Sequence, residues 1–150
     1  MQRLIYTNKA KPPADYQAIL EGAQGRNETL GITGGLVIVD GVFLHYLEGP
    51  AAEVAWLFEK ILQDERHYGV KVLECRPIPK RLFDDWKMGV LSWVDETKMI
   101  FRSFSPGHTL DLYETDPSTA APLFRAWAST RHWNQALPTR AEMDRDSRLV

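Results

Sequence analysis

The stretch GGLVIVDGVFLHYL, residues 34–47, decides the fold. Its first half is a continuous apolar run, which suits a β-strand that is covered on both faces. The pair Asp40-Gly41 then predicts a tight hairpin turn, after which the chain returns as an antiparallel strand. Because side chains alternate between the faces of a strand, the returning strand presents two sets of residues. These are Phe43, His45 and Leu47 on one face and Val42, Leu44 and Tyr46 on the other.

Two amphipathic segments flank this hairpin. Before it, apolar residues recur at helical spacing from Tyr16 to Ala23, which predicts a helix that ends near residues 25–27. After Gly49-Pro50, residues 54–62 show the same spacing and predict a second helix. Three more strands are predicted by short apolar or β-branched runs at residues 3–7, 70–75 and 87–94.

The resulting order, β-α-β-β-α-β-β, predicts a ferredoxin-like α+β fold. Its two helices cross one face of a mainly antiparallel sheet. A C-terminal helix after Asp116-Pro117, which carries Leu123, Phe124 and Trp127, is expected to cover the other face. We therefore expect one domain over residues 1–95, a helical extension over 96–133 and a polar, flexible tail over 134–150.

The composition excludes several classes of protein. Of the 150 residues, 44% are hydrophobic and 25% are charged, as in ordinary soluble domains. The net charge of −2 predicts neither nucleic-acid nor anionic-membrane binding, and no apolar run is long enough to span a membrane. The chain enters a strand at once, so we expect no signal peptide. The single cysteine, Cys75, suits a cytoplasmic location, and we expect a small apolar strand residue rather than a reactive thiol.

Motifs of common enzyme and nucleotide sites are absent from the sequence. It contains no GxGxxG after a strand, no P-loop, no GxSxG and no HExxH. The four histidines, at positions 45, 67, 108 and 132, lack the spacing of metal ligands. We therefore predict neither a metal site nor an enzyme.

Two polar rings are expected inside the sheet. His45 lies between Phe43 and Leu47 on one strand face. It is either a buried histidine that a backbone group satisfies or part of a polar pocket under the helices. Tyr6 shares a face with Leu4 on a central strand, and its buried hydroxyl needs a partner. Ordinary core packing with one backbone hydrogen bond is the alternative for Tyr6.

Two further polar residues follow the predicted helices. Asn27 is either a helix C-terminal residue in a left-handed turn or an amide that hydrogen-bonds the edge of a bound ring. Arg66 is either a solvated charge or a group that reaches an anion or carbonyl in the gap between the helices.

Taken together, these positions resemble the BLUF family, the sensors of blue light using flavin. The resemblance runs over residues 2–94, and its most specific part is Gly-Ile-Thr-Gly at 31–34 followed by Leu-Glu-Gly-Pro at 47–50. The matching stretches are Arg3-Leu4-Ile5-Tyr6, Arg26-Asn27, Gly31-Ile32-Thr33-Gly34, Phe43-Leu44-His45-Tyr46-Leu47-Glu48-Gly49-Pro50, Asp64-Glu65-Arg66-His67 and Trp86-Lys87-Met88.

The resemblance implies a non-covalently bound flavin between the two crossover helices. This flavin is usually FAD, with FMN or riboflavin as alternatives. Tyr6 would be the tyrosine that gives an electron and a proton to the flavin in light, and Asn27 would hold the carbonyl edge of the ring. The other implied flavin contacts are Ile19, Arg26, Arg66 and His67. Trp86 and Met88 would match fifth-strand residues that are linked to signal output.

The sequence departs from the family at one position. Phe43-Leu44-His45 stands where typical members read Phe-x-Gln, and that glutamine bridges the tyrosine and the flavin. A neutral imidazole also has one donor and one acceptor, so His45 is able to bridge them, but it cannot exchange the two by the route of an amide. We therefore expect altered photochemistry. The dark state is expected to depend on pH, with burial favouring the neutral ring.

Three hypotheses cover these observations. The first is a flavin-binding light sensor with altered photochemistry, and the second is a flavin-binding but light-silent interaction module. The third, an acyl-phosphate hydrolase, needs a phosphate-binding loop after the first strand, and residues 7–11 contain no glycine to form one. Because no catalytic effector follows residue 94, we expect signalling to a separate, unidentified protein that docks on Trp93 and the C-terminal helix. Self-association is an open alternative.

Overall fold

The core of the protein is a six-stranded sheet in the order β4-β1-β3-β2-β5-β6. It is seen in a computed structural model that describes residues 1–84, 88–105, 107 and 110–135. The strands are β1 (Gln2–Ala10), β2 (Thr33–Val39), β3 (Val42–Gly49), β4 (His67–Pro77), β5 (Gly89–Leu91) and β6 (Trp133–Asn134). The helices are α1 (Tyr16–Leu30), α2 (Ala51–Gln63), α3 (Asp95–Phe104) and α4 (Ala120–Ala128), with short 3₁₀ helices η2 (Leu112–Glu114) and η3 (Pro117–Thr119).

The predicted hairpin forms the middle of the sheet. Strands β2 and β3 pair antiparallel in register from Val39 opposite Val42 to Thr33 opposite Glu48. At the turn, Asp40 and Gly41 have φ values of 51° and 76°, the two positive angles that a type I′ hairpin turn requires. Strand β1 pairs with the other side of β3, also antiparallel.

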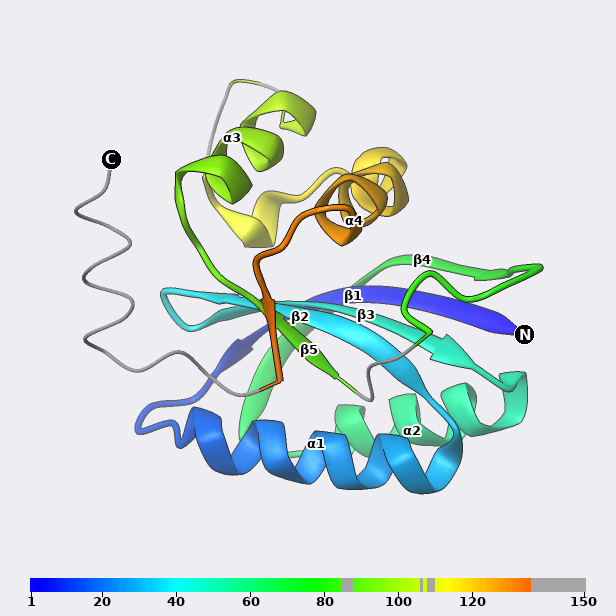
Figure 1. Ribbon diagram of the computed structural model, residues 1–150. Helices are drawn as coiled ribbons and strands as arrows, with labels where there is room; N and C mark the ends of the chain where they lie inside the picture. Colours follow the sequence, from blue (N-terminus) through cyan, green and yellow to red (C-terminus); the bar gives the residue numbers. More distant parts are fainter. Residues whose placement is uncertain (85–87, 106, 108–109, 136–150) are drawn as a thin grey trace.

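The sheet divides the apolar core into two layers. Helices α1 and α2 lie side by side across one face, and α3 and α4 lie over the other (Figure 1). We call the first the α1–α2 layer and the second the cap layer. The α1–α2 layer includes Leu4, Tyr6, Ile19, Phe43, Leu47, Leu57 and Met88. The cap layer includes Ile5, Leu44, Tyr46, Phe101, Phe124 and Trp127. This arrangement confirms the predicted ferredoxin-like α+β fold and the predicted alternation along β3.

Helix α1 is longer than predicted. It continues to Leu30 and ends at Gly31, whose φ of 68° places it in the left-handed region and whose N–H bonds the carbonyls of Asn27 and Glu28. Asn27 therefore lies inside the helix, and its interpretation as a left-handed C-terminal residue was wrong. Gly25 and Asn27 are weak helix formers, but tertiary packing carries the helix past both.

Three strands differ clearly from their predicted lengths. β1, predicted over 3–7, runs from Gln2 to Ala10. β4 extends beyond 70–75 at both ends, because its pairing with β1 runs from Ala10 opposite His67 to Gln2 opposite Pro77. β5 covers only three of the residues predicted as strand, and it pairs parallel with β2. Residues 92–94 instead lead into α3, a helix that was predicted only as part of a helical extension. Its start is fixed by Thr97, whose Oγ1 accepts the Val94 N–H at 2.9 Å.

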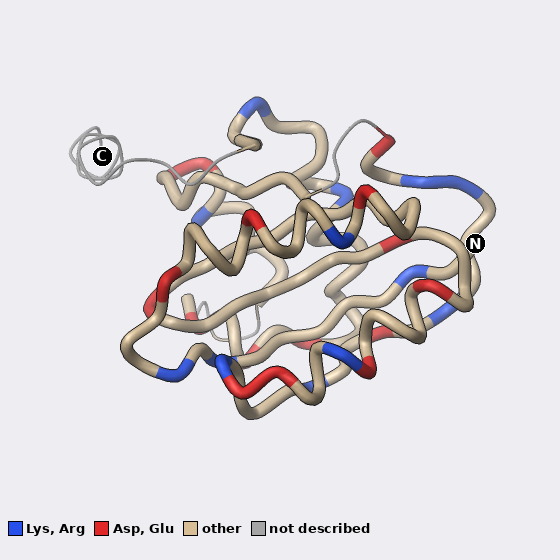
Figure 2. Tube along the Cα trace, turned by 90° about the horizontal axis from the view of Figure 1, so that it is seen from below, with Lys and Arg blue, Asp and Glu red and all other residues tan. Residues whose placement is uncertain are grey.

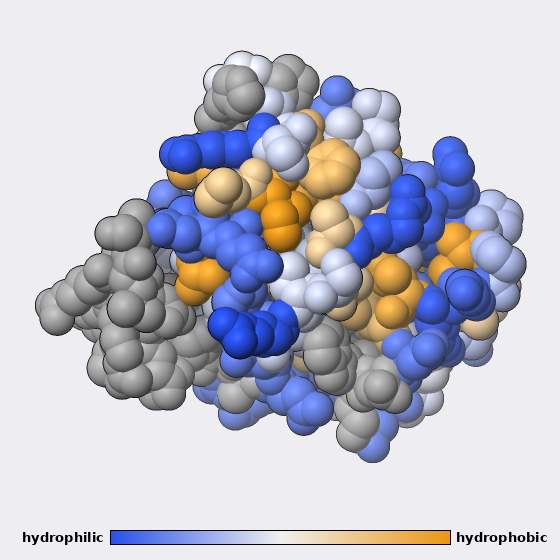
Figure 3. All heavy atoms as spheres, turned by 45° about the horizontal axis from the view of Figure 1, so that its top comes forward, coloured by the Kyte–Doolittle hydropathy of each residue, from blue (hydrophilic) through white to orange (hydrophobic). Residues whose placement is uncertain are grey.

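The C-terminal part of the chain covers the far face of the sheet, as predicted. After Asp116-Pro117 the chain forms η3 and then α4, whose Leu123, Phe124 and Trp127 are buried. Figure 3 looks toward this side and shows apolar residues as separate patches among hydrophilic ones. The tail was predicted to begin at residue 134, but Asn134 belongs to β6 and pairs with Val90 of β5. Beyond residue 135 the predicted tail lies outside the described residues.

The outer surfaces of α1 and α2 carry charges of both signs. Figure 2 views these helices from outside and shows Lys and Arg interspersed with Asp and Glu, without a patch of one sign. No helix in the described part of the chain combines the length and apolar character needed to cross a membrane.

Candidate functional site

A tyrosine and a histidine stack inside the α1–α2 layer. Tyr6 on β1 lies opposite His45 on β3, and alternation turns both side chains toward the helices. Their rings are 6° from parallel, with centroids 4.6 Å apart. Both residues are buried. The centre of this apolar layer therefore contains two polar rings in direct contact.

Further rings surround this pair. Phe58 of α2 tilts against Tyr6 with 5.7 Å between centroids, and Phe43 lies at the same distance from His45. The ring of His67, at the start of β4, packs edge-on to Phe43 at 5.1 Å. Phe43 thus contacts both histidines, and the surroundings suit a flat aromatic ligand.

Unpartnered polar atoms gather in the same layer. Among the described residues, the buried side-chain atoms without a hydrogen-bond partner are Asn8 Nδ2 and Oδ1, Arg26 Nε, His45 Nδ1 and His67 Nδ1. Asn8 shares a strand face with Tyr6, and Arg26 extends from α1. Leaving such a group unsatisfied costs about 1–3 kcal/mol. A cluster of them on one side of the sheet indicates a place where a ligand supplies the partners.

Burial fixes the protonation states of this layer. It raises the pKa of the Tyr6 hydroxyl above its ordinary value, against a smaller opposing effect of the Arg26 charge. Burial lowers the pKa of His45 to about 3, with a smaller contribution from nearby His67. It also lowers the pKa of His67. At neutral pH the phenol therefore keeps its proton and the His45 ring is neutral, so each offers both a donor and an acceptor.

Arg66 lies at the edge of this layer. Its Nε and Nη2 donate to the carboxylate of Asp64 at 3.0 and 2.7 Å, and its side chain is 46% exposed. Hydrogen bonding from Arg66 lowers the pKa of Asp64 to about 2. Asp64 therefore holds the guanidinium beside the layer.

A cleft of about 340 Å³ opens next to Arg66. Its walls come from residues 11–15, from Ala18 and Ile19 of α1, and from Glu65 and Arg66 after α2. Ile19 belongs both to this cleft and to the α1–α2 layer, so the cleft borders the layer. Lys11 and Arg66 bring two positive charges to it and Asp15 and Glu65 bring two negative ones, so its lining suits a polar group that leaves the layer here.

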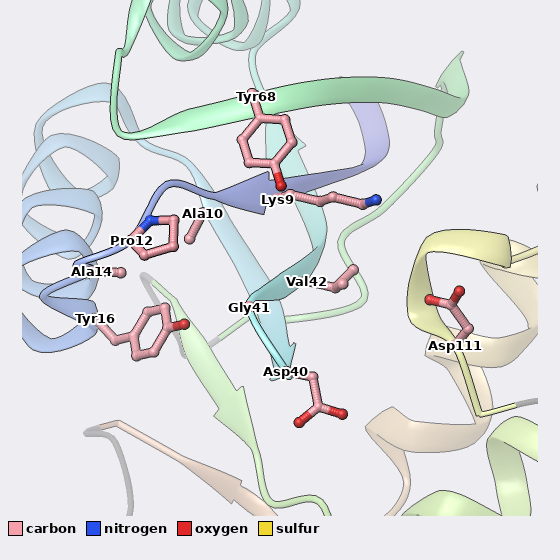
Figure 4. A pocket seen from close by; sticks show the side chains of 10 residues that line it. All are labelled: Lys9, Ala10, Pro12, Ala14, Tyr16, Asp40, Gly41, Val42, Tyr68 and Asp111. Carbon is pink, nitrogen blue, oxygen red and sulfur yellow. The ribbon is translucent and has the colours of Figure 1, made fainter.

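A second hollow, of about 620 Å³, lies at the hairpin end of the sheet (Figure 4). Lys9, Tyr16, Asp40, Tyr68 and Asp111 contribute to its walls. None of the residues with unpartnered buried atoms lines it. We therefore assign the candidate site to the α1–α2 layer and its bordering cleft.

The structure brings most of the predicted site residues together. Tyr6 and His45 stack, His67 packs against Phe43 beside them, and the charge of Arg26 lies close enough to act on Tyr6. Ile19, Asn27 and Met88 are also buried, and the Met88 carbonyl accepts Gln24 Nε2 of α1 at 3.2 Å, which ties β5 to that helix. Arg66 borders the site without entering it. Trp86 lies outside the described residues.

Sequence reasoning missed two members of the site, Asn8 and Phe58. Phe58 was assigned only to the apolar stripe of its helix. Asn8 lies just beyond the strand predicted over 3–7, and because β1 continues to Ala10, alternation places Asn8 on the same inner face as Tyr6. The missed signal was an amide on a strand face that is otherwise apolar.

The sequence also matches a family model directly. Residues 1–89 match the model described as BLUF, sensors of blue-light using FAD. The chain belongs to the BLUF family. The predicted resemblance is thus confirmed, and this part of the chain is a flavin-binding blue-light sensor domain.

Related proteins agree with the BLUF assignment. Photoactivated adenylate cyclase subunit beta of Euglena longa is 38% identical over 89 residues, which is 57% of this chain but 10% of the relative. The photo-activated state of BlsA superposes with a TM-score of 0.78 at 25% identity, over 87% of this chain and 96% of that one. BlrP1 of Klebsiella pneumoniae, with FMN and cyclic diGMP, gives a TM-score of 0.57 at 33% identity, over 60% of this chain and 25% of that one.

The residues of the BLUF domain fit a flavin. An isoalloxazine ring has broad aromatic faces and an edge of carbonyl oxygens and ring nitrogens. The aromatic residues of the α1–α2 layer match the faces, and the unpartnered atoms of Asn8, Arg26, His45 and His67 match the polar edge. The described residues contain no group of three side chains able to hold a metal ion.

Proposed function

We propose that this BLUF domain senses blue light with Tyr6 as the donor of an electron and a proton and with His45 as the bridging residue. The buried Tyr6–His45 stack is the observation that carries the proposal. A bound flavin supplies the light absorption and accepts the electron. His45 stands where typical members carry a glutamine, so an imidazole takes the place of an amide.

The protonation states support these roles. The raised pKa of Tyr6 keeps the proton on the phenol until the ring is oxidised, when the phenol becomes a far stronger acid. The lowered pKa of His45 keeps its ring neutral, so that one nitrogen is free to accept a proton while the other releases one. Because stacked rings do not hydrogen-bond face to face, the imidazole edge would have to turn toward the Tyr6 hydroxyl to take its proton, whereas an amide exchanges its donor and acceptor ends.

We propose FAD as the cofactor, with FMN and riboflavin as alternatives. The family description names FAD, and the related Klebsiella pneumoniae structure holds FMN. Contacts to the ring are assigned to Ile19, Arg26, Asn27 and His67. Arg66, at the bordering cleft, is assigned to the polar tail of the flavin.

For signal output we propose a separate cytoplasmic protein and no catalytic activity of the chain itself. The match covers only a tenth of the Euglena longa cyclase subunit, so the activity of that whole protein does not carry over. Met88 and Trp86 are the proposed output residues at the flavin. Trp93, which packs on Phe101 and Trp127, and α4 are the proposed docking surface, with a second copy of this chain as the alternative partner.

A light-silent flavin module is the second candidate function. It is favoured by one observation, that position 45 carries histidine instead of the glutamine of typical members. In that case the scaffold and the flavin are kept and the hydrogen-bond switch is lost.

The test is the absorption spectrum of the purified protein in the dark and under blue light, repeated for Tyr6→Phe and His45→Gln. A sensor gives a bound flavin and a light-induced change that Tyr6→Phe abolishes. A persistent red-shifted state in His45→Gln alone establishes the light-silent module. Protein that takes up no flavin would refute both candidates, and a light response unchanged in Tyr6→Phe would refute the assigned donor.

A further inference from the structure

The strand that carries Tyr6 is paired irregularly on one side. Strand β1 pairs with β3 without a break from Gln2 to Lys9. Its pairing with β4 shifts register twice, between Ile5 and Tyr6 and again between Thr7 and Lys9. At each shift β4 supplies one residue more than β1, which is the pattern of a β-bulge. Bulges are frequent beside functional sites, where they redirect side chains.

Asn8 lies within the second of these irregularities. Its side chain is 0% exposed, and neither Nδ2 nor Oδ1 has a hydrogen-bond partner among the described residues. An asparagine seldom occupies a strand interior, and burial of both ends of its amide without partners is unfavourable. Packing alone therefore does not account for Asn8.

The position of Asn8 places its amide beside the Tyr6–His45 stack. Asn8 shares the inner face of β1 with Tyr6 and lies opposite Phe43, so it is a diagonal neighbour of His45. Diagonal neighbours on one face are separated by about 7–8 Å, close enough for one ligand ring to contact both. An amide offers a donor and an acceptor at every pH, which matches an edge that alternates carbonyl oxygens and ring nitrogens.

We propose that Asn8 is a flavin-binding residue whose carboxamide hydrogen-bonds the polar edge of the ring next to His45. The inference rests on the proposed flavin site. It gives that site an amide on β1 beside the imidazole on β3. The unpartnered ends of Asn8 gain their hydrogen bonds only when the flavin is bound.

This role predicts effects of opposite sign with and without flavin. Flavin-free Asn8→Val is expected to resist urea better than flavin-free wild type, because the change removes two unpartnered polar groups and installs a strand-favouring side chain. The same variant is expected to bind FAD about tenfold more weakly, the effect of losing one hydrogen bond. Its bound flavin is expected to show a shifted dark absorption band and a shifted carbonyl stretching frequency.

Thr7 provides the matched control. It is the neighbour of Asn8, it is also 0% exposed, and its Oγ1 donates to the Phe43 carbonyl at 2.8 Å. Thr7→Val is expected to lower the urea midpoint with and without flavin, while the affinity for FAD and both spectral positions stay as in wild type.

The measurements separate the possible failures. Wild-type affinity and unchanged spectra in Asn8→Val would overturn the role of Asn8 and leave the flavin site intact. Reduced urea resistance of flavin-free Asn8→Val, together with unchanged spectra, would make Asn8 a structural residue. If wild-type protein takes up none of FAD, FMN and riboflavin, the proposed function itself fails.

Discussion

Buried polar groups on the two faces of the sheet differ in their hydrogen bonding. In the cap layer the indole N–H of Trp127 donates to the Thr97 carbonyl at 3.1 Å, and that of Trp133 donates to the Trp127 carbonyl at 2.8 Å. In the α1–α2 layer, Asn8 and His45 carry buried atoms without partners in the described structure. The same strands thus form one layer whose indole N–H groups bond within the protein and one layer whose unpartnered polar atoms are suited to a ligand.

This difference separates stability from binding. Side chains in the cap layer should affect the free energy of unfolding and leave the flavin spectrum unchanged. Polar side chains in the α1–α2 layer should affect the flavin first, and their removal should cost little in the flavin-free protein. The following changes test this division.

The largest effect is expected for Trp127→Ala. Trp127 is fully buried, and it packs against Trp93, Phe101 and Phe124. Its truncation should lower the free energy of unfolding by about 3–5 kcal/mol, measured by urea denaturation. The absorption maximum of flavin bound to the remaining folded protein should not move. Trp56→Ala, at a half-exposed tryptophan of α2, is the control and should stay within about 0.5 kcal/mol of wild type.

A smaller effect is expected for Glu48→Ala. The Glu48 carboxylate accepts the Leu82 and Phe83 N–H groups at 2.7 and 2.5 Å on the cap side of the sheet. Its loss removes the acceptor of both hydrogen bonds, at about 2–4 kcal/mol in total by urea denaturation. Glu48→Gln keeps one acceptor oxygen and should lose less. Wild-type stability in Glu48→Ala would show that these hydrogen bonds contribute nothing.

The smallest effect is a pH dependence due to His45. Unfolded His45 binds a proton below about pH 6.5, whereas burial prevents this in the folded protein down to about pH 3. The unfolded state then holds more protons, so stability falls as pH falls through this window. Between pH 7 and pH 5 the flavin-free protein should lose on the order of 2 kcal/mol in urea denaturation. His45→Gln should flatten this slope, and an unchanged slope would show that His45 is not buried in neutral form.

Much of the fold was predictable because its signals are local. The Asp40-Gly41 turn and the alternation along β3 depend on residues that are neighbours in sequence, and both predictions are confirmed. The end of α1 and the length of β5 depend on partners distant in the chain. Gly25 and Asn27 were read as a helix end, whereas packing continues the helix to Gly31.

The candidate site was predictable where a residue type was unusual for its face. Tyr6 and His45 stood out as polar rings on apolar strand faces, and the structure stacks them. Asn8 was missed because the first strand was predicted to end at residue 7, whereas pairing with β3 and β4 continues β1 to Ala10. The roles assigned to these residues, and the role of Trp86, stay predictions.

Strand β3 places two unlike environments on consecutive residues. His45 contacts Tyr6 on one side of the sheet, and the next residue, Tyr46, packs against Phe83 and Phe124 on the other. The two residues are joined by one planar peptide group, so a displacement of the backbone at His45 acts directly on Tyr46. The α1–α2 layer and the cap layer are therefore connected by a single peptide bond at this point of the sheet. Movement of the His45 backbone reaches the cap layer through the next residue, which is the shortest connection possible between the two faces of a sheet.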